Sequence, residues 1–230
     1  MNLDALWHDL ECGDYREDLP FWRALAAETG GPVLDIGAGT GRVTVDLVAA
    51  GADVVALDIE PALLAALRHR AAVETVVADA CTFALDRRFG LIVAPMQTLQ
   101  LLPDRTAFLR RALAHLRPGG LLAAAVADAM DAFDDEHPIP PPPQVRDVGA
   151  VRYASQLLAV VEDGGRAALH RRRQITGRET EHVVVHLDRV TPDQLAAEAA
   201  ALGFVAEPHR HVPETDRYLG ATIVLLRAPT

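Results

Sequence analysis

Short apolar runs alternate with amphipathic stretches along the first half of this 230-residue chain. The runs consist almost entirely of Val, Leu, Ile and Ala, a pattern typical of parallel strands that are buried on both faces. They predict strands at residues 32–36, 54–58, 75–79, 89–94 and 121–128. The remaining stretches space their apolar positions as helices do, and they predict helices at residues 14–28, 42–50, 61–71 and 104–117. This alternation predicts an α/β fold with a doubly wound, mostly parallel sheet.

The pattern changes after residue 128. An acidic stretch at residues 131–136 leads into a proline-rich segment at residues 137–143, which can form neither a helix nor a central strand. The sequence leaves open whether that segment is a plain connector or part of a lid. Runs separated by Gly-containing turns then predict antiparallel strands at residues 151–161, 167–175 and 182–187. We therefore expect an antiparallel insertion at about residues 145–190.

The last part of the chain carries a complete set of helix signals. Thr191 is placed to cap the helix, Pro192 takes its first position, Gln194 completes a capping box, and Gly203 ends it. Two further strands are predicted at residues 204–207 and 221–227. Residues 1–230 are expected to form one domain, which is long enough to bury a large core.

The sequence between residues 33 and 42 carries the strongest functional signal. A buried strand leads into Gly37, Gly39 and Gly41 and then into a helix. Glycines are required where the backbone takes positive φ or approaches a ligand closely, and the following helix directs free N–H groups at that turn. An acidic residue, Asp58, follows Gly37 by 21 positions at the end of the next strand, where it could bind both ribose hydroxyls. Asp58 could also serve as a helix cap before Pro61, and both roles can hold together.

Two details identify the expected cofactor. The spacing Gly-Ala-Gly-Thr-Gly differs from the Gly-x-Gly-x-x-Gly that holds a pyrophosphate at a helix start. Asp35 lies two residues before the first glycine, where its carboxylate would repel a pyrophosphate but suit a ligand with an ammonium group. Both details favour S-adenosylmethionine over a nicotinamide dinucleotide.

With these residues the chain resembles the class I S-adenosylmethionine-dependent methyltransferases that act on small molecules. The resemblance rests on five motifs in the family's order and spacing, at residues 33–42, 56–59, 77–81, 89–102 and 116–120. It implies a Rossmann-like, seven-stranded, mostly parallel sheet whose last two strands form an antiparallel hairpin at one edge. It also implies S-adenosyl-L-methionine as cofactor and S-adenosyl-L-homocysteine as product.

The resemblance implies roles for individual residues at the matching positions. The glycine turn would hold the methionine portion of the cofactor, Asp58 the ribose, Ile59 the adenine ring and Asp79 the adenine amino group. The full set that would bind the cofactor is Asp35, Gly37, Ala38, Gly39, Thr40, Gly41, Asp58, Ile59, Asp79, Ala80, Cys81, Ala94 and Pro95. The set that would contact the substrate is Met96, Gln97 and Gln100.

The residues that would move a proton are less well defined. Leu101 occupies a position where many relatives carry a His, and neither Gln97 nor Gln100 can act as a base. The candidate bases are His8, Glu11, Tyr15, His137, His170 and His186. His8 and Tyr15 are favoured because residues 1–30 are expected to form a helical cap that covers the active site. Ordinary helix packing is an equal alternative for Tyr15.

Composition narrows the class of function further. The formal net charge of −10 argues against a nucleic-acid surface, and the motif used for base flipping is absent at residues 94–97. The chain contains no lysine, which excludes Schiff-base and P-loop chemistry. Cys12 and Cys81 predict neither a disulfide framework nor a metal site. No apolar run approaches the ~18 residues of a membrane span, and the start lacks a secretory signal, so a cytoplasmic protein is expected.

These observations predict methyl transfer from S-adenosylmethionine to a nitrogen, oxygen or carbon nucleophile of a small molecule in secondary or specialised metabolism. The partners are a small-molecule substrate without nucleic acid or membrane, and homodimer formation is left open. One alternative is a cyclisation, elimination or rearrangement on the same scaffold, because fold does not fix function. A nicotinamide-dependent oxidoreductase is disfavoured by Asp35. A cofactor-sensing protein without turnover is a further alternative.

Overall fold

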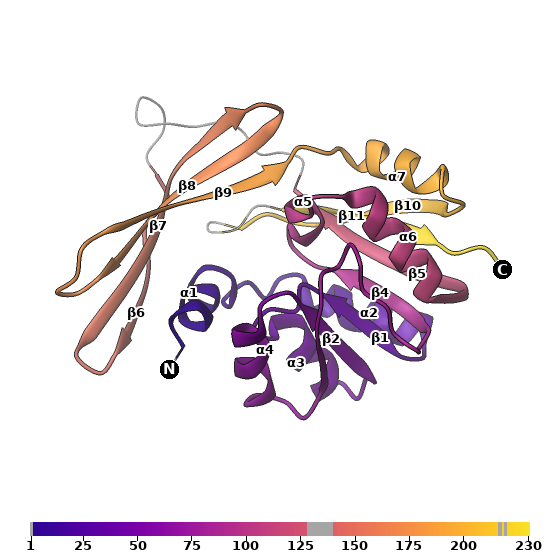
Figure 1. Cartoon of the computed structure of the whole chain (residues 1–230), viewed down its shortest axis with the longest axis horizontal. Helices are drawn as coiled ribbons and strands as arrows, with labels where there is room; N and C mark the ends of the chain where they lie inside the picture. The colour runs from indigo at the N-terminus through magenta and orange to yellow at the C-terminus, as the bar shows by residue number, and fades with distance from the viewer. Residues whose placement is uncertain (1, 128–139, 216–217, 219) are drawn as a thin grey trace.

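The computed structural model describes residues 2–127, 140–215, 218 and 220–230. Its centre is a seven-stranded sheet of order β10-β11-β5-β4-β1-β2-β3 (Figure 1). The strands are β1 Val33–Ile36, β2 Val54–Asp58, β3 Glu74–Val77, β4 Phe89–Ala94, β5 Leu116–Val126, β10 Val205–Val212 and β11 Ala221–Arg227. β1 to β5 pair in parallel, and β11 lies antiparallel between β5 and β10. The predicted fold class is confirmed.

Helices cover both faces of this sheet. They are α1 Leu3–Cys12, α2 Leu19–Thr29, α3 Arg42–Ala49, α4 Pro61–Arg68, α5 Thr98–Leu101, α6 Arg105–His115 and α7 Pro192–Ala200. One face packs Leu34 and Ile92 against α6 and α7, and the other packs Val33 and Leu91 against α2 and α3. Successive strand residues thus enter opposite cores, which explains why β1 and β4 are almost entirely apolar, with Asp35 as the exception. No helix in the described residues is long and apolar enough to cross a membrane.

The insertion forms a separate four-stranded antiparallel sheet of order β6-β7-β8-β9. Its strands are β6 Gln144–Val148, β7 Val151–Asp163, β8 Arg166–Ile175 and β9 Glu181–Asp188. β6 was not expected, because its alternating polar residues lack an apolar run. The sheet stands beside the seven-stranded sheet with α1 between them (Figure 1). Trp7 on α1 packs against Tyr153 on β7 with ring centroids 5.8 Å apart.

The amino-terminal segment differs from the prediction. Instead of one helix over residues 14–28, the structure has α1 and α2 joined by a short connection. Pro20 sits in the first turn of α2, where its missing N–H costs nothing, so the second helix begins at Leu19. The prediction of Tyr15 on a helix is therefore wrong, since Tyr15 lies in the connection.

The proline-rich segment lies only partly within the described residues. Residues 140–143 have no regular secondary structure, and Gln156 on β7 donates a hydrogen bond to the carbonyl of Pro141. The acidic stretch 131–136 and the candidate base His137 fall outside the described residues.

Candidate functional site

The glycine turn reverses the chain between β1 and α3. Gly37 and Gly39 have φ of 67° and 56°, in the left-handed region that favours glycine. A Cβ on Gly37 would lie 2.6 Å from the Thr98 side chain, and a Cβ on Gly39 would lie 2.3 Å from His8 Nε2. The turn therefore has no room for side chains, because α5 and α1 approach its backbone closely.

Asp58 connects this turn to the loop that follows β2. Its Oδ2 accepts the Gly39 N–H at 2.7 Å, and its Oδ1 accepts the Glu60 N–H at 2.8 Å. Glu60, rather than Asp58, is the cap residue of α4, and Pro61 begins the helix. The Asp58 carboxylate thus holds two loops in place while it lines the cavity described next.

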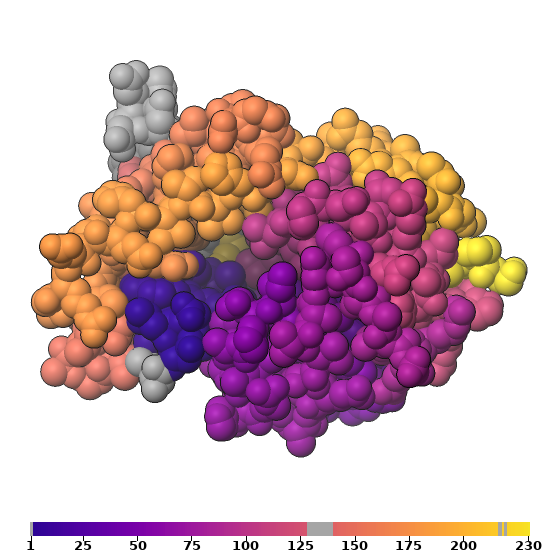
Figure 2. Space-filling model, in the orientation of Figure 1, coloured from indigo at the N-terminus to yellow at the C-terminus, as the bar shows by residue number. Residues whose placement is uncertain are grey.

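A cavity of about 410 Å³ opens at the carboxyl ends of β1, β2 and β4. Figure 2 shows the surface hollowed between α1, in indigo, and the segment that follows β4, in magenta. Ligands in open α/β sheets bind at this edge. The predicted site residues that line the cavity are His8, Asp35, Gly37, Ala38, Asp58, Ile59, Asp79, Ala80, Pro95, Met96 and Gln97.

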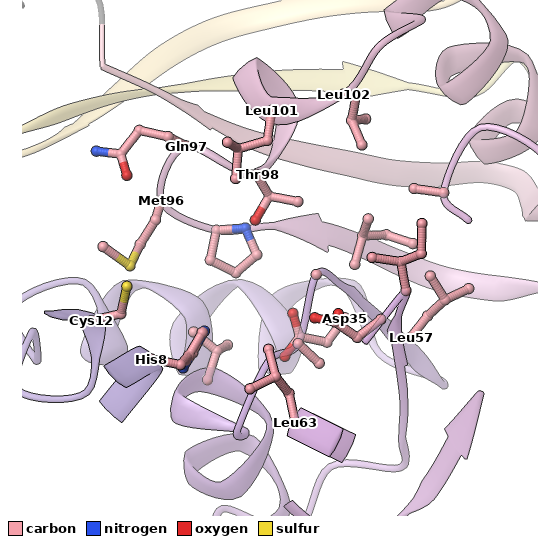
Figure 3. A pocket seen from close by; sticks show the side chains of 18 of the residues that line it. His8, Cys12, Asp35, Leu57, Leu63, Met96, Gln97, Thr98, Leu101 and Leu102 are labelled. Atoms are coloured by element: carbon pink, nitrogen blue, oxygen red, sulfur yellow. The ribbon is translucent and has the colours of Figure 1, made fainter. Parts of the chain in front are cut away.

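Several further residues line the cavity in addition to the individually predicted site residues. They are Cys12, Ile36, Arg42, Val43, Leu57, Leu63, Ala78, Thr98, Leu101, Leu102 and Pro103. The sequence did contain a signal for Cys12, because it follows His8 by one helical turn and so shares its face of α1. Figure 3 shows Cys12 and Met96 with their sulfur atoms pointing toward one another at one end of the cavity.

Other predicted residues lie next to the cavity rather than in its lining. Gly39, Thr40 and Gly41 complete the turn, and the Thr40 hydroxyl contacts α1. Ala94 and Cys81 are packed in the core behind the site. The Cys81 N–H donates to Asp79 Oδ1 at 2.7 Å and so fixes the loop that carries Asp79.

Gln100 and Tyr15 have different surroundings from those expected of substrate-binding residues. The buried Gln100 amide donates to the carbonyls of Ala127 and Asp188, both at 3.1 Å, and accepts the Ala127 N–H at 2.9 Å. Gln100 therefore ties the ends of β5 and β9 together and is outside the cavity lining. Tyr15 lines a neighbouring hollow of about 30 Å³ that shares Met96 and Gln97 with the main cavity.

Asp35 is the most unusual group in the cavity. Its carboxyl is 1% exposed, and Oδ2 accepts the Thr44 hydroxyl at 2.6 Å. Oδ1 is buried without a hydrogen-bond partner among the described residues. Burial raises the pKa of Asp35 to about 7, although Thr44 and Arg42 oppose the shift. An unsatisfied carboxylate oxygen is costly in such a place, so a cationic ligand would be stabilised there.

The end of the cavity near Met96 has a strained backbone and, beside it, a buried hydroxyl without a partner among the described residues. Met96 has φ of 52°, unusual for a residue with a side chain and typical of positions constrained by function. The Tyr15 hydroxyl is buried and has no hydrogen-bond partner in the described parts of the chain. Burial raises the pKa of Tyr15 to about 12, so the hydroxyl stays protonated. The Tyr15 ring packs on Tyr218 and lies beneath the Arg42 guanidinium, each at 5.0 Å.

Arg42 links this end to the amino-terminal helices. Its guanidinium forms two hydrogen bonds with the Asp18 carboxylate, at 2.5 and 2.8 Å, and donates to the carbonyl of Tyr15. Trp22 donates to the same carboxylate at 2.8 Å. Arg42 is therefore neutralised by Asp18 and carries no free charge for a substrate.

The remaining candidate bases lie away from the cavity lining. Glu11 is held in an ion pair with Arg173, His170 is exposed, and His186 contacts Asp163 at 3.1 Å. Of the candidates in the described residues, only His8 lines the cavity and only Tyr15 lines the adjoining hollow. Burial lowers the pKa of His8, although Asp58 and Asp9 oppose that shift.

Comparison with known proteins agrees with this geometry. Residues 33–120 match the family model described as a methyltransferase domain. The chain is 39% identical over 99 residues to trans-aconitate 2-methyltransferase of Methylobacterium radiotolerans, a match that spans 41% of this chain and 37% of that protein.

Solved structures resemble the chain over nearly its whole length. The sugar N-methyltransferase KedS8 from Streptoalloteichus superposes with a TM-score of 0.79 at 18% identity, covering 100% of this chain and 94% of that one. CalS10, an amino pentose methyltransferase from Micromonospora echinaspora, superposes with a TM-score of 0.68 at 23% identity, covering 96% of this chain and 92% of that one. The glycopeptide N-methyltransferase MtfA superposes with a TM-score of 0.61 at 23% identity, covering 95% of this chain and 97% of that one. These likenesses establish the fold, which is that of the S-adenosylmethionine-dependent methyltransferases, and residues 33–120 match the methyltransferase-domain model within it.

Proposed function

We propose that the protein transfers the methyl group of S-adenosylmethionine to an amine of a small molecule, with an amino sugar as the leading acceptor class. The observation that carries the cofactor is that Asp35 lines the cavity and that its buried Oδ1 lacks a hydrogen-bond partner in the described structure. The observation that favours an amine is that the described residues at the acceptor end offer neutral polar groups, while the carboxylate of Asp18 there is paired with Arg42. Three structural relatives are named as methyltransferases of sugar, amino-sugar and glycopeptide substrates, which supports this choice.

The cofactor residues fit the groups of S-adenosylmethionine in order along the cavity. Asp35 would accept from the ammonium group, and the methionine chain would lie in the cavity beside Gly37 and Ala38. Asp58 would accept from the ribose, the exposed Ile59 would cover the adenine, and Asp79 with Ala80 would meet its polar edge. Bound there, S-adenosylmethionine supplies a methyl group already activated as a sulfonium, so the protein contributes mainly alignment and exclusion of water.

The acceptor would occupy the end formed by Met96, Gln97 and Tyr15. A neutral amine needs no base before it reacts with a sulfonium methyl group, in keeping with the neutral side chains at this end. The protonated Tyr15 hydroxyl oxygen can accept an amine N–H and so leave the nitrogen lone pair free to react. The antiparallel insertion and α1 would close this end from the substrate side.

The test is a methylation assay with deuterated-methyl S-adenosylmethionine and a panel of amino sugars, neutral sugars and di- or tricarboxylic acids. We expect labelled methyl on the amino sugars alone, with release of S-adenosylhomocysteine. Methylation of a carboxylate, as the name of the curated relative suggests for that enzyme, would overturn the amine assignment. An acceptor consumed without a gain in mass would favour the rearrangement alternative. Calorimetry should show binding of S-adenosylhomocysteine and none of NADH.

The role of Tyr15 has its own test. Tyr15→Phe removes the hydroxyl and keeps the packing on Tyr218, so we expect kcat to fall about tenfold, the loss of one hydrogen bond. The affinity for S-adenosylhomocysteine should not change. Tyr153→Phe is the matched control, because Tyr153 packs on Trp7 in the four-stranded sheet. Equal kcat values for the two variants would remove Tyr15 from the acceptor site.

A further inference from the structure

His8 lines the cavity but has no part in the function proposed above. It projects from α1, the helix that separates the glycine turn from the four-stranded sheet. Figure 3 shows His8 on the same side of the cavity as Asp35 and Leu63, with Thr98 and Leu101 across from them. Its Nε2 lies so close above Gly39 that a Cβ there would be 2.3 Å away.

A chain of hydrogen bonds fixes which nitrogen of His8 carries the proton. The Asp9 carboxylate can only accept, and it receives two hydrogen bonds from Arg70, at 2.8 and 2.5 Å. Burial would raise the pKa of Asp9, but the hydrogen bonds from Arg70 and Thr40 hold it below the usual value. The Thr40 hydroxyl must therefore donate to Asp9, at 2.6 Å.

This orientation leaves the Thr40 oxygen as an acceptor toward α1. His8 Nδ1 lies 3.1 Å from it and must donate its N–H. Since burial lowers the pKa of His8, the ring is neutral and Nε2 carries a lone pair. His8 therefore presents a fixed hydrogen-bond acceptor above the glycine turn.

The position of that acceptor points to the ribose. The Gly39 N–H beneath it is bound to Asp58, the predicted ribose ligand, and Asp58 has the largest electrostatic influence on His8 of any acid. Both Asp58 oxygens already accept a backbone N–H. A ribose has two adjacent hydroxyls to satisfy, and a second acceptor next to Asp58 would serve one of them.

We propose that His8 Nε2 accepts a hydrogen bond from a ribose hydroxyl of the bound cofactor and thereby fastens α1 over it. This proposal rests on the function proposed above. His8 is then a cofactor-binding residue rather than a base. Because α1 also packs on the four-stranded sheet, cofactor binding would order the wall of the acceptor site as well.

Calorimetry of the whole protein tests this without an acceptor. The probes are S-adenosylhomocysteine, its 2′-deoxy and 3′-deoxy analogues, and methylthioadenosine, which keeps the ribose but lacks the amino-acid group. We expect His8→Phe to weaken the binding of S-adenosylhomocysteine and of methylthioadenosine by about 3- to 10-fold, which is the effect of losing one hydrogen bond. One of the deoxy analogues should bind wild type and variant equally.

Thr40→Val provides a second variant that keeps the imidazole. It removes the acceptor that fixes the tautomer, so Nε2 can take the proton and the same ribose-dependent loss is expected. Asp4→Asn, at an exposed position of α1, is the matched control and should bind as wild type does. Hydrogen exchange of α1 amides should slow when S-adenosylhomocysteine binds to wild type, and should not slow in His8→Phe.

The outcomes separate this proposal from the proposed function. If wild type fails to bind S-adenosylhomocysteine, the cofactor assignment itself falls. If wild type and His8→Phe bind S-adenosylhomocysteine equally, the ribose contact is wrong. It is also wrong if the affinity lost in His8→Phe is not seen with methylthioadenosine but is seen with both deoxy analogues. Retained α1 protection in His8→Phe would overturn the fastening of the helix.

Discussion

The seven-stranded and four-stranded sheets differ in how their residues are stabilised. The central strands of the large sheet are largely apolar on both faces and lie between two helical layers. The small sheet has only a small apolar cluster around Ala167 and Leu187, and it meets α1 partly through charged groups. The large sheet thus supports the proposed cofactor site through local strand-to-helix turns, whereas the proposed acceptor side depends on contacts between distant segments.

The largest loss of stability should come from the hydrogen bonds of Gln100, which connect the two sheets. Gln100→Leu leaves the buried Ala127 N–H and the carbonyls of Ala127 and Asp188 without their side-chain partner. We expect a loss of about 3 kcal/mol in the free energy of unfolding, measured by urea denaturation. A decrease of less than about 1 kcal/mol in the free energy of unfolding would mean that the Gln100 hydrogen bonds do not couple the two sheets.

The next effect concerns the contact of α1 with the small sheet. Glu11 accepts from Arg173, at 2.8 Å to both oxygens, and from the Ser155 hydroxyl at 2.7 Å. Glu11→Gln removes the ion pair, whose side chains are only 11% and 20% exposed, and should cost about 2 kcal/mol in thermal or urea unfolding. The acceptor KM should rise while the affinity for S-adenosylhomocysteine stays within about twofold of wild type. An equal loss of both affinities would contradict the division between the two regions.

The pH dependence of Glu11 follows from the direction of its shift. Burial alone would raise its pKa, but hydrogen bonds from Arg173 and Ser155 hold it below the usual value. A carboxyl whose pKa is lower in the folded than in the unfolded state stabilises the fold above its unfolded pKa. That contribution is lost as the pH falls through the folded value, and in Glu11→Gln it should be absent at every pH.

Asp35 in the cofactor region should behave in the opposite way. Its folded pKa of about 7 lies above the ordinary value of 3.8, so the cofactor-free protein loses stability as the pH rises between those values. An ammonium ligand requires the ionised carboxyl, so the affinity for S-adenosylhomocysteine should fall about tenfold per pH unit below pH 7 and level off above it. Asp35→Asn should bind more weakly at about pH 8 and show little slope.

Calorimetry across this pH range makes the measurement. His8, the imidazole that lines the same cavity, is neutral at about pH 7 and above because burial lowers its pKa. Any slope that remains in Asp35→Asn would have to come from another group, and would remove Asp35 from the ammonium site.

The two regions also differ in how far the sequence predicts them. The glycine turn and the positions of Asp35 and Asp58 in the cavity lining could be predicted because each depends on a short stretch in which a strand ends and leads toward a helix. The surroundings of Gln100 could not, because its partners lie 27 and 88 residues away in the chain. Tyr15 was expected at the active site from the family resemblance, but Pro20 was not recognised as the start of a separate helix.

Two elements were missed for different physical reasons. α1 did have a local signal, since Asn2 caps it and Leu6, Trp7 and Leu10 are spaced as on one helical face. β6 had only a weak one, the glycine of the two-residue turn Gly149–Ala150 that joins it to β7, because it is an edge strand of mostly polar residues. Whether such a strand forms depends more on its neighbours than on its own residues.

The smallest effect should come from an exposed ion pair of the small sheet. Arg152 on β7 contacts Asp147 on β6 through two hydrogen bonds, at 2.8 and 3.0 Å, but the side chains are 64% and 54% exposed. Water and salt screen such a pair, so Arg152→Ala should leave the melting temperature, the affinity for S-adenosylhomocysteine and the acceptor KM unchanged. Glu11→Gln, measured in parallel, breaks a contact of the same sheet on the side that faces α1. A rise in acceptor KM in Arg152→Ala would show that the exposed part of the sheet, and not only its α1 side, contributes to the acceptor site.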